Sequence, residues 1–267
     1  MEKLMIRALG WHPASAARPV LDQVTLCLEK GHFYGVLGQN GSGKTSLARH
    51  ILRLLPIREG GIAFDATPLG QLSQTQLAKT VAYMPQASQI QADFTVYDVV
   101  AMGRTPYLRP FEPLGAADRQ AVEAALALTG CEAFAQQSIL TVSGGERQRA
   151  IMARTIAQQT PWMVIDEPVA SLDVLHQTRL MRALEAQNRE KGTTIVAVMH
   201  DINLAAQHCT DLILMKAGRV LAFGPVWQVL TPENLHALYE MPFVAAQIPG
   251  RETPWFLPDD TQRERGL

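Results

Sequence analysis

The chain has 267 residues, of which 47% are hydrophobic and 18% are charged, and its formal net charge is −1. This length suits one large domain or two modest ones, and the near-zero charge excludes a general basic surface that would attract nucleic acid. The three cysteines lie far apart without a metal-type spacing, which favours thiols in a reducing compartment. We expect no signal peptide and find no apolar run of about 20 residues, so a role at a membrane would require another chain that crosses it.

Short apolar runs alternate with segments of helical spacing along most of the chain. Leu47, Ile51 and Leu54 recur every three or four positions, as in an amphipathic helix, whereas 32–37 is a short apolar run. The tail from Pro249 is rich in proline and charge, and we expect it to be irregular. The predicted strands cover 20–28, 32–37, 162–165, 194–199, 212–215 and 220–223, and the predicted helices cover 45–55, 96–102, 116–128 and 143–159.

The order of these elements predicts an α/β fold with a mainly parallel sheet, because strands that alternate with helices form βαβ units. A block of helices interrupts this alternation and is expected to form an inserted helical subdomain. The expected division is a core of residues 1–86 and 160–240, a helical subdomain of residues 87–159, and a C-terminal tail of residues 241–267.

A glycine-rich loop, residues 38–45, lies between a predicted strand and a predicted helix. Its sequence matches the pattern G-x-x-x-x-G-K-[ST]. Such a loop turns backbone N–H groups toward a polyphosphate, and the helix N-terminus adds partial positive charge. A glycine-rich turn before a helix is the simpler alternative. We expect Lys44 to reach the β- and γ-phosphates of ATP and Thr45 to ligate Mg²⁺. The predicted ATP-binding residues of the loop are Gly38, Asn40, Gly41, Ser42, Gly43, Lys44, Thr45 and Ser46.

Two acids, Asp166 and Glu167, follow the apolar residues 162–165 at the end of a predicted strand. In an open parallel sheet, ligands bind beyond the carboxyl ends of the strands, where the glycine-rich loop also lies. We predict that Asp166 holds Mg²⁺ and that Glu167 orients or deprotonates the attacking water. Without the glycine-rich loop, two solvated acids at a strand end would be the preferred explanation.

The segment Ser143-Gly144-Gly145-Glu146 opens the last predicted helix of the inserted block. Ser143 and Glu146 have the spacing of a capping box. With this segment the chain resembles the ATP-binding-cassette (ABC) ATPases, whose usual signature is Leu-Ser-Gly-Gly-Gln, although Val142 replaces the leucine and Glu146 the glutamine. The resemblance implies that these residues bind the γ-phosphate of ATP held by the opposite subunit. We expect Ser143 to cap its helix without ATP and to turn to the phosphate when the dimer closes.

Other motifs of this family occur in the expected order. Gln86 matches the glutamine that joins the two lobes and contributes to the Mg²⁺ site, His200 matches the switch histidine, and Asp173 ends a D-loop at 170–173. Each has an ordinary structural explanation by itself, so their order carries the resemblance, which covers about residues 4–240. It implies a P-loop NTPase (RecA-like) core with an antiparallel β subdomain at the N-terminus. The implied catalytic residues are Glu167, His200 and Lys44.

An aromatic residue stacks on adenine in this family, shortly before the second strand. Trp11 is the candidate here, with His12 as the alternative. The indole ring offers a large π-face for stacking. A surface turn residue is the other interpretation of Trp11, and both stay open.

The segment 95–107 and the run 200–206 narrow the resemblance to the ATPases of bacterial importers for iron–siderophore complexes, haem and cobalamin. This implies an ATP-hydrolysing motor at the cytoplasmic face of the inner membrane. Its implied partners are a second copy in a head-to-tail dimer, two transmembrane permease subunits and, indirectly, a periplasmic substrate-binding protein. Segment 95–107 is expected to line the groove that receives the permease, although a helix that packs on its own domain is the alternative.

Other function classes share parts of this sequence pattern. A soluble ABC ATPase that is not tied to transport, or a transporter subunit for another solute, remains an alternative. A P-loop kinase or GTPase is disfavoured by the segment 143–146 and by the lack of an Asn-Lys-x-Asp guanine-reading motif. A catalytically silent binding module is disfavoured because every expected catalytic residue is present.

Overall fold

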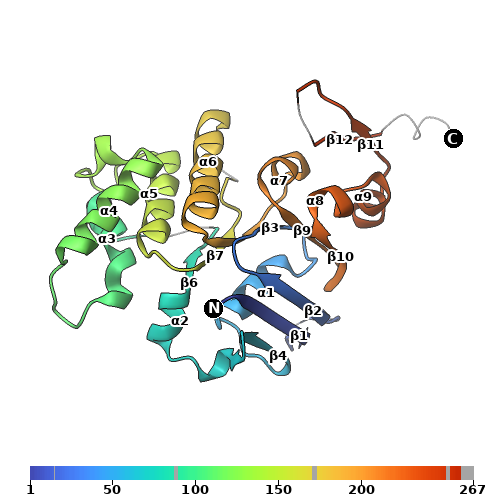
Figure 1. The fold of residues 1–267 in the computed structure, drawn as a ribbon, viewed down its shortest axis with the longest axis horizontal. Coiled ribbons are helices and arrows are strands. Elements are labelled where there is room, and N and C mark those ends of the chain that lie inside the picture. The colour runs from blue at the N-terminus through green and yellow to red at the C-terminus, as the bar shows by residue number, and fades with distance from the viewer. Residues whose placement is uncertain (15, 87–89, 170–172, 251–252, 260–267) are drawn as a thin grey trace.

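The computed structural model describes residues 1–14, 16–86, 90–169, 173–250 and 253–259. Its largest sheet has six strands in the order β10-β9-β3-β8-β7-β6 (Figure 1). All neighbours in it are parallel except β9 and β10, which form an antiparallel pair. The strands are β3 (Phe33–Leu37), β6 (Val81–Met84), β7 (Trp162–Asp166), β8 (Thr194–Val198), β9 (Asp211–Lys216) and β10 (Arg219–Pro225). The predicted α/β fold with a mainly parallel sheet is confirmed.

A second sheet is antiparallel and has the strand order β2-β1-β4-β5. Its strands are β1 (Lys3–Trp11), β2 (Leu21–Glu29), β4 (Glu59–Phe64) and β5 (Thr67–Pro68). Inward and outward residues alternate along β2, as expected for a sheet with one buried face. The implied N-terminal antiparallel β subdomain is therefore confirmed.

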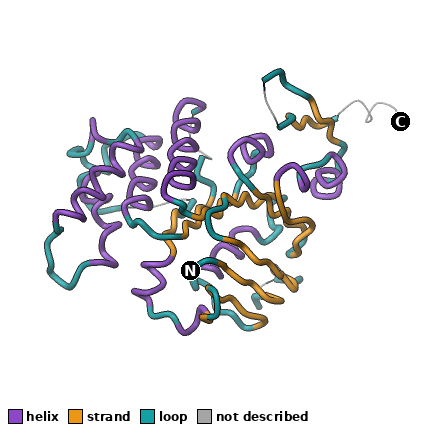
Figure 2. The backbone as a smooth tube through the Cα atoms, viewed as in Figure 1, coloured by secondary structure: helices purple, strands orange, loops and turns teal. Residues whose placement is uncertain are grey.

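The helices cover both faces of the six-stranded sheet. Helices α3 to α5 gather at one end of the molecule, opposite the C-terminal strands (Figures 1 and 2), which confirms the predicted helical insertion. The helices are α1 (Lys44–Ile51), α2 (Gln74–Thr80), α3 (Val96–Ala101), α4 (Ala116–Thr129), α5 (Gly144–Ala157), α6 (Val174–Lys191), α7 (Ile202–His208), α8 (Val226–Val229) and α9 (Pro232–Tyr239). Short 3-10 helices are η1 (Leu69–Gln71), η2 (Met102–Tyr107) and η3 (Glu132–Phe134). No helix in the described part of the chain is long and apolar enough to cross a membrane.

Two hydrophobic clusters lie on opposite faces of the six-stranded sheet. One joins α1 and the antiparallel sheet to one face, with Leu4, Leu47 and Val164 among its members. The other joins the helical insertion, α6, α7 and the C-terminal elements to the opposite face. Because both faces are covered, every residue of β3, β7 and β8 is buried.

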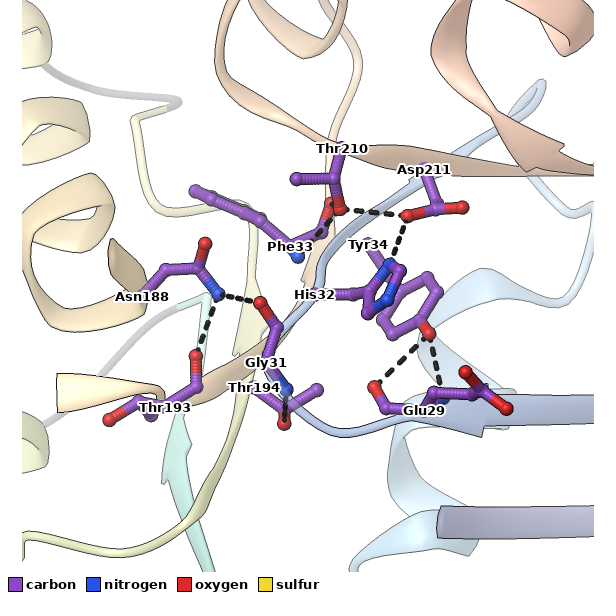
Figure 3. A network of polar contacts seen from close by, with 10 residues as sticks. All are labelled: Glu29, Gly31, His32, Phe33, Tyr34, Asn188, Thr193, Thr194, Thr210 and Asp211. Carbon is purple, nitrogen blue, oxygen red and sulfur yellow. Dashed lines mark hydrogen bonds and ion pairs between the residues drawn. The ribbon is translucent and has the colours of Figure 1, made fainter. Parts of the chain in front are cut away.

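A polar network ties together the starts of β3, β8 and β9 (Figure 3). The Asn188 amide donates to the carbonyl oxygens of Gly31 and Thr193, both at 2.9 Å. His32 Nδ1 lies 2.6 Å from Asp211 Oδ2, which also accepts a hydrogen bond from the Thr210 hydroxyl. The network fixes the relative register of the strands whose opposite ends carry the candidate site.

The C-terminal region contains a hairpin, so the expectation of an irregular tail from Pro249 is wrong for residues 255–258. Strands β11 (Phe243–Ala246) and β12 (Trp255–Pro258) pair in antiparallel register. Phe243 and Phe256 are buried in the hydrophobic cluster of the helical face. The Asn203 side chain accepts from Phe256 N–H at 2.8 Å and donates to its carbonyl oxygen at 3.1 Å. The tail from Pro249 is rich in proline and charge, but the hairpin packs on α7 and α9.

Candidate functional site

The glycine-rich loop connects β3 to α1 and is shaped by backbone constraints. Gly41 and Gly43 have φ angles of +79° and +101°, which disfavour any residue with a Cβ atom. A Cβ atom added to Gly38 would lie 2.2 Å from the carbonyl oxygen of Met215 in β9. The loop therefore needs glycine at these three positions for its curled path.

The ammonium group of Lys44 lies inside the curl of the loop. Its Nζ donates hydrogen bonds to the carbonyl oxygens of Gly38 at 2.8 Å and Gln39 at 3.0 Å. Burial lowers the pKa of Lys44, while the carboxylates of Glu167 and Asp166 act in the opposite direction. The Lys44 ammonium group is therefore held at the loop, where it can bind an anionic ligand.

The hydroxyl oxygen of Thr45 lies beside a carboxylate oxygen of Asp166. The Thr45 hydroxyl donates to Asp166 Oδ1 at 3.3 Å. Asp166 ends β7 and is 1% exposed, and this burial raises the pKa of its carboxyl group. A nearby cation would favour the charged form and offset this effect. Hydroxyl and carboxylate oxygens are the ligands that Mg²⁺ prefers, so the residues present fit a Mg²⁺ ion.

The Glu167 carboxylate has two polar partners from distant parts of the chain. Gln86 Nε2, which follows β6, donates to Glu167 Oε2 at 2.6 Å. His200 Nε2, which follows β8, lies 2.5 Å from Glu167 Oε1. The sequence predicts that Gln86 and His200 act on the nucleotide and Mg²⁺, but it does not predict their joint contact with Glu167. Parallel strands explain it, because the residues after β6, β7 and β8 meet at one sheet edge.

A cavity of about 160 Å³ lies over the loop and beside the Glu167 carboxylate. The Ser42 hydroxyl at this cavity is buried and has no hydrogen-bond partner among the described residues, as expected for a group that serves a ligand. The cavity is lined by Val20, Asn40, Gly41, Ser42, Gly43, Lys44, Thr45, Ser46, Glu167 and His200. Except for Val20, all of these were predicted from the sequence.

Val20 is a lining residue that sequence reasoning missed. It precedes β2, and its carbonyl oxygen would lie 2.6 Å from a Cβ atom added to Gly43. Nothing in its residue type marks it, since only the tertiary fold brings the start of β2 over the loop. Trp11 does not line the cavity. Its indole packs edge-on against His50 of α1, with ring centroids 5.4 Å apart.

The segment 143–146 opens α5 on the helical insertion, away from the loop cavity. The predicted capping box is present: Ser143 Oγ accepts from Glu146 N–H at 3.3 Å, and Glu146 Oε2 accepts from Ser143 N–H at 2.9 Å. Hydrogen bonds that the Ser143 N–H and hydroxyl donate to the Glu146 carboxylate lower the pKa of Glu146. A Cβ atom added to Gly144 would meet nothing within 4 Å, so the helix N-terminus is open on this side. None of these residues, Gly145 included, lines the cavity.

The D-loop was expected at 170–173. Residues 170–172 lie outside the described part of the chain, and Asp173 caps α6 by accepting from His176 N–H at 2.9 Å. In the described residues no cluster of histidine, cysteine and acidic side chains forms a preassembled metal site. The Thr45–Asp166 pair therefore remains the candidate for a cation, and it would act together with ligand oxygens.

Comparisons with known proteins agree with this geometry. Residues 21–170 match the family model described as ABC transporter. The ferric enterobactin transport ATP-binding protein of Escherichia coli (strain K12) is 34% identical over 239 residues, which are 90% of this chain and 88% of that protein. The hemin import ATP-binding protein of Pseudomonas fluorescens (strain Pf0-1) is 36% identical over 255 residues, which are 94% of this chain and 98% of that protein.

Solved structures show the same fold. A metal-chelate type ABC transporter in an inward-facing conformation matches with a TM-score of 0.82 and 27% identity, over 97% of this chain and 98% of that chain. The ATP-binding cassette MJ0796, bound to ADP and Pi in a dimeric post-hydrolysis state, matches with a TM-score of 0.73 and 24% identity, over 84% of this chain and 98% of that chain. The chain belongs to the ABC transporter family and is one of its nucleotide-binding ATPases, similar to the ATP-binding subunits of siderophore, haem and cobalamin importers.

Proposed function

We propose that this chain is the ATP-hydrolysing subunit of an importer for an iron–siderophore complex, haem or cobalamin, working through a separate permease. The observation that carries the ATPase part is the Glu167 carboxylate, held by Gln86 and His200 beside the phosphate loop. The importer part is supported by relatives whose names specify ferric enterobactin, hemin and cobalamin.

Each residue of the candidate site has a separate role in the proposed hydrolysis. Backbone N–H groups of the loop and Lys44 would bind the β- and γ-phosphates, and Thr45 and Asp166, with Gln86, would hold Mg²⁺, which would neutralise phosphate charge. Glu167 orients a water molecule and accepts its proton. His200 contacts Glu167 and lines the cavity. It can therefore hold the Glu167 carboxylate in its orientation toward the cavity or bind the γ-phosphate.

A second copy of the chain completes the site in this proposal. The N-terminus of α5 does not line the loop cavity of its own chain, yet the space beside Gly144 is open, which leaves room for an anion at this helix N-terminus. In a head-to-tail dimer, residues 143–146 of one copy cover the phosphates bound by the other. The core of residues 1–86 and 160–240 and the helical subdomain of residues 87–159 then act as two lobes of one motor.

A groove between these lobes is the proposed contact with the permease. It has a volume of about 450 Å³ and lies among α2, η2 and the C-terminal half of α5. Its lining includes Met102 and Gly103. Both belong to the segment 95–107, which is predicted to line the permease interface. A Cβ atom added to Gly103 would lie 2.3 Å from the Arg154 carbonyl oxygen, so η2 packs closely on α5. The proposed site of action is the cytoplasmic face of the membrane, with a periplasmic binding protein as an indirect partner.

Co-expression with candidate permease subunits tests the proposal. We expect a membrane complex that hydrolyses ATP faster when a binding protein loaded with a siderophore complex, haem or cobalamin is added. A deletion strain should lose growth on the matching iron source or vitamin. A chain that stays soluble, and a strain that grows normally on all of these nutrients, would favour an ABC ATPase that is not tied to this transport.

A further inference from the structure

The backbone around Glu167 is held on both sides by hydrogen bonds. The Glu167 N–H donates to the carbonyl oxygen of Val198 at 3.1 Å. The carbonyl oxygen of the following residue, Pro168, accepts a hydrogen bond from Gln148 Nε2 at 3.3 Å. The φ angle of Glu167 is +52°, and a residue with a side chain keeps such a conformation only when its surroundings hold it. The hydrogen bonds with Val198 and Gln148 contribute to that restraint.

These two hydrogen bonds come from different lobes of the chain. Val198 ends β8 in the core, whereas Gln148 lies on α5 in the helical lobe and is partly buried. The next residue on α5, Arg149, donates instead to the Gly130 carbonyl oxygen at 2.9 Å, within the helical lobe. Gln148 is therefore a polar contact between the helical lobe and the core backbone beside Glu167.

The chain between the Gln148 contact and the Glu167 side chain is short and stiff. Pro168 is buried, its ring fixes its φ angle, and the peptide bond before it is planar. The two ψ angles of Glu167 and Pro168 are thus the soft torsions between the Cα atom of Glu167 and the Pro168 carbonyl group. A displacement of α5 that moves this carbonyl group is therefore passed on to Glu167, because little of it can be absorbed in between.

We propose that Gln148 is a positioning residue for Glu167, and that ATP hydrolysis depends through it on the placement of the helical lobe against the core. The inference rests on the proposed role of Glu167 as the group that orients water and accepts its proton. Gln148 does not line the loop cavity, so it acts through Glu167 and not on the nucleotide. Its loss should slow the chemical step, which is sensitive to small displacements of a catalytic group, and should leave ATP binding intact.

Two substitutions in the full chain separate the hydrogen bond of Gln148 from its packing. Gln148→Met keeps the length and helix propensity of the side chain but has no N–H donor, whereas Gln148→Lys keeps a donor of comparable reach. We expect Gln148→Met to lower kcat about tenfold while the Kd for ATP stays the same, and Gln148→Lys to keep most of kcat. A packing role predicts the reverse order, because methionine fills a partly buried position and lysine brings a charge into it.

A double variant shows whether Gln148 acts through Glu167. Single-turnover hydrolysis by Glu167→Gln should be slow, and adding Gln148→Met to it should slow it no further, because both changes affect the same step. Gln120 is exposed on α4 of the same lobe, so Gln120→Met is the matched control and should keep normal kcat. ATP binding and thermal unfolding report whether each variant is folded. Gln148→Glu, which keeps the side-chain shape but only accepts hydrogen bonds, is the second variant without a donor and should lose kcat in the same way.

The failure of this inference can be distinguished from the failure of the proposed role of Glu167. If Glu167→Gln hydrolyses ATP rapidly, the role of Glu167 is wrong and the inference fails with it. If Glu167→Gln is nearly inactive but folded Gln148→Met and Gln148→Glu keep normal kcat, only the role of Gln148 is wrong. Losses that multiply in the double variant, or a larger loss in Gln148→Lys than in Gln148→Met, also overturn the inference.

Discussion

Glu167 has a rarely populated backbone conformation and well-defined side-chain contacts. Its φ angle is +52°, a conformation that costs free energy for a residue with a side chain and that clusters at functional sites. Its carboxylate is held between Gln86 at 2.6 Å and His200 at 2.5 Å. The strained backbone and the two contacts together aim this side chain at the loop cavity.

Glu167→Gln should abolish turnover while keeping ATP binding. Glutamine retains the shape of the side chain but cannot accept a proton from water, so we expect hydrolysis to fall about 100-fold or more. Steady-state turnover and nucleotide binding measure the two effects, and gel filtration with ATP should show a trapped dimer. Glu190→Gln on the exposed side of α6 is the matched control. Rapid turnover by Glu167→Gln would falsify the role of Glu167.

Trp11→Ala tests whether the indole stacks on adenine. Stacking predicts that the affinity for ATP falls about tenfold, while the affinity for inorganic tripolyphosphate, which has no base, is unchanged. Calorimetric titration measures both ligands. Because Trp11 packs on His50, a structural role would weaken both ligands together, and that result would count against stacking.

At the scale of elements, the Ser143 hydroxyl at the N-terminus of α5 has two roles, one as a helix cap and one as a predicted phosphate ligand. Ser143 Oγ accepts from Glu146 N–H and donates to the Glu146 carboxylate. The same serine is predicted to meet a phosphate of the partner's nucleotide, and the two contacts compete for it. In the proposed dimer, ATP would therefore have to replace part of this cap.

Ser143→Asp separates these two uses. Aspartate caps helices as well as serine does, so the free energy of unfolding should change by less than about 1 kcal/mol. Its negative charge repels a phosphate, and we expect ATP hydrolysis to fall about tenfold or more. Chemical denaturation and turnover are the measurements. Normal hydrolysis by this variant would show that Ser143 does not meet the phosphate.

One side chain of α7, Asn203, makes two hydrogen bonds to the C-terminal hairpin. Replacing Asn203 with Leu removes both hydrogen bonds to the Phe256 backbone, and it leaves partly buried polar groups without partners at a cost of about 1–3 kcal/mol. Hydrogen exchange of the β12 amides should become faster. Gln207→Leu is the control, because its side chain bonds only within α7. Unchanged exchange in Asn203→Leu would contradict this account.

At the scale of the whole molecule, the phosphate loop and segment 143–146 lie on different lobes. The loop cavity is lined by core residues only, and the N-terminus of α5 opens elsewhere. A single chain therefore offers two half-sites rather than one complete site, provided that the dimer proposal holds. Activity should then rise more steeply than protein concentration until the dimer is saturated.

Mixing two inactive variants tests the composite site. Lys44→Ala removes the loop cation, and Ser143→Asp blocks the opposite half-site, so each variant alone should be nearly inactive. A mixed dimer contains one intact site, built from the loop of the Ser143→Asp chain and the α5 N-terminus of the Lys44→Ala chain. We expect turnover to reappear on mixing. If gel filtration detects dimers but the mixture does not hydrolyse ATP, the result would contradict a site shared between copies.

The sequence alone determined the chemistry of the site and the fold class. The loop residues 38–45 and the pair Asp166–Glu167 could be assigned because glycines, a lysine and carboxylates at these spacings serve phosphate and Mg²⁺ chemistry regardless of distant contacts. Alternating strands and helices predicted the parallel sheet, since hydrophobic periodicity is a local property. The capping box of α5 was predicted for the same reason.

Only the tertiary structure decided which distant residues meet. Gln86 and His200 contact Glu167 because β6, β7 and β8 lie side by side, and no local pattern contains that information. Val20 over the loop and the hairpin β11–β12 likewise depend on packing between segments far apart in the chain. Local spacing specifies which chemical groups are present, whereas long-range packing specifies their partners.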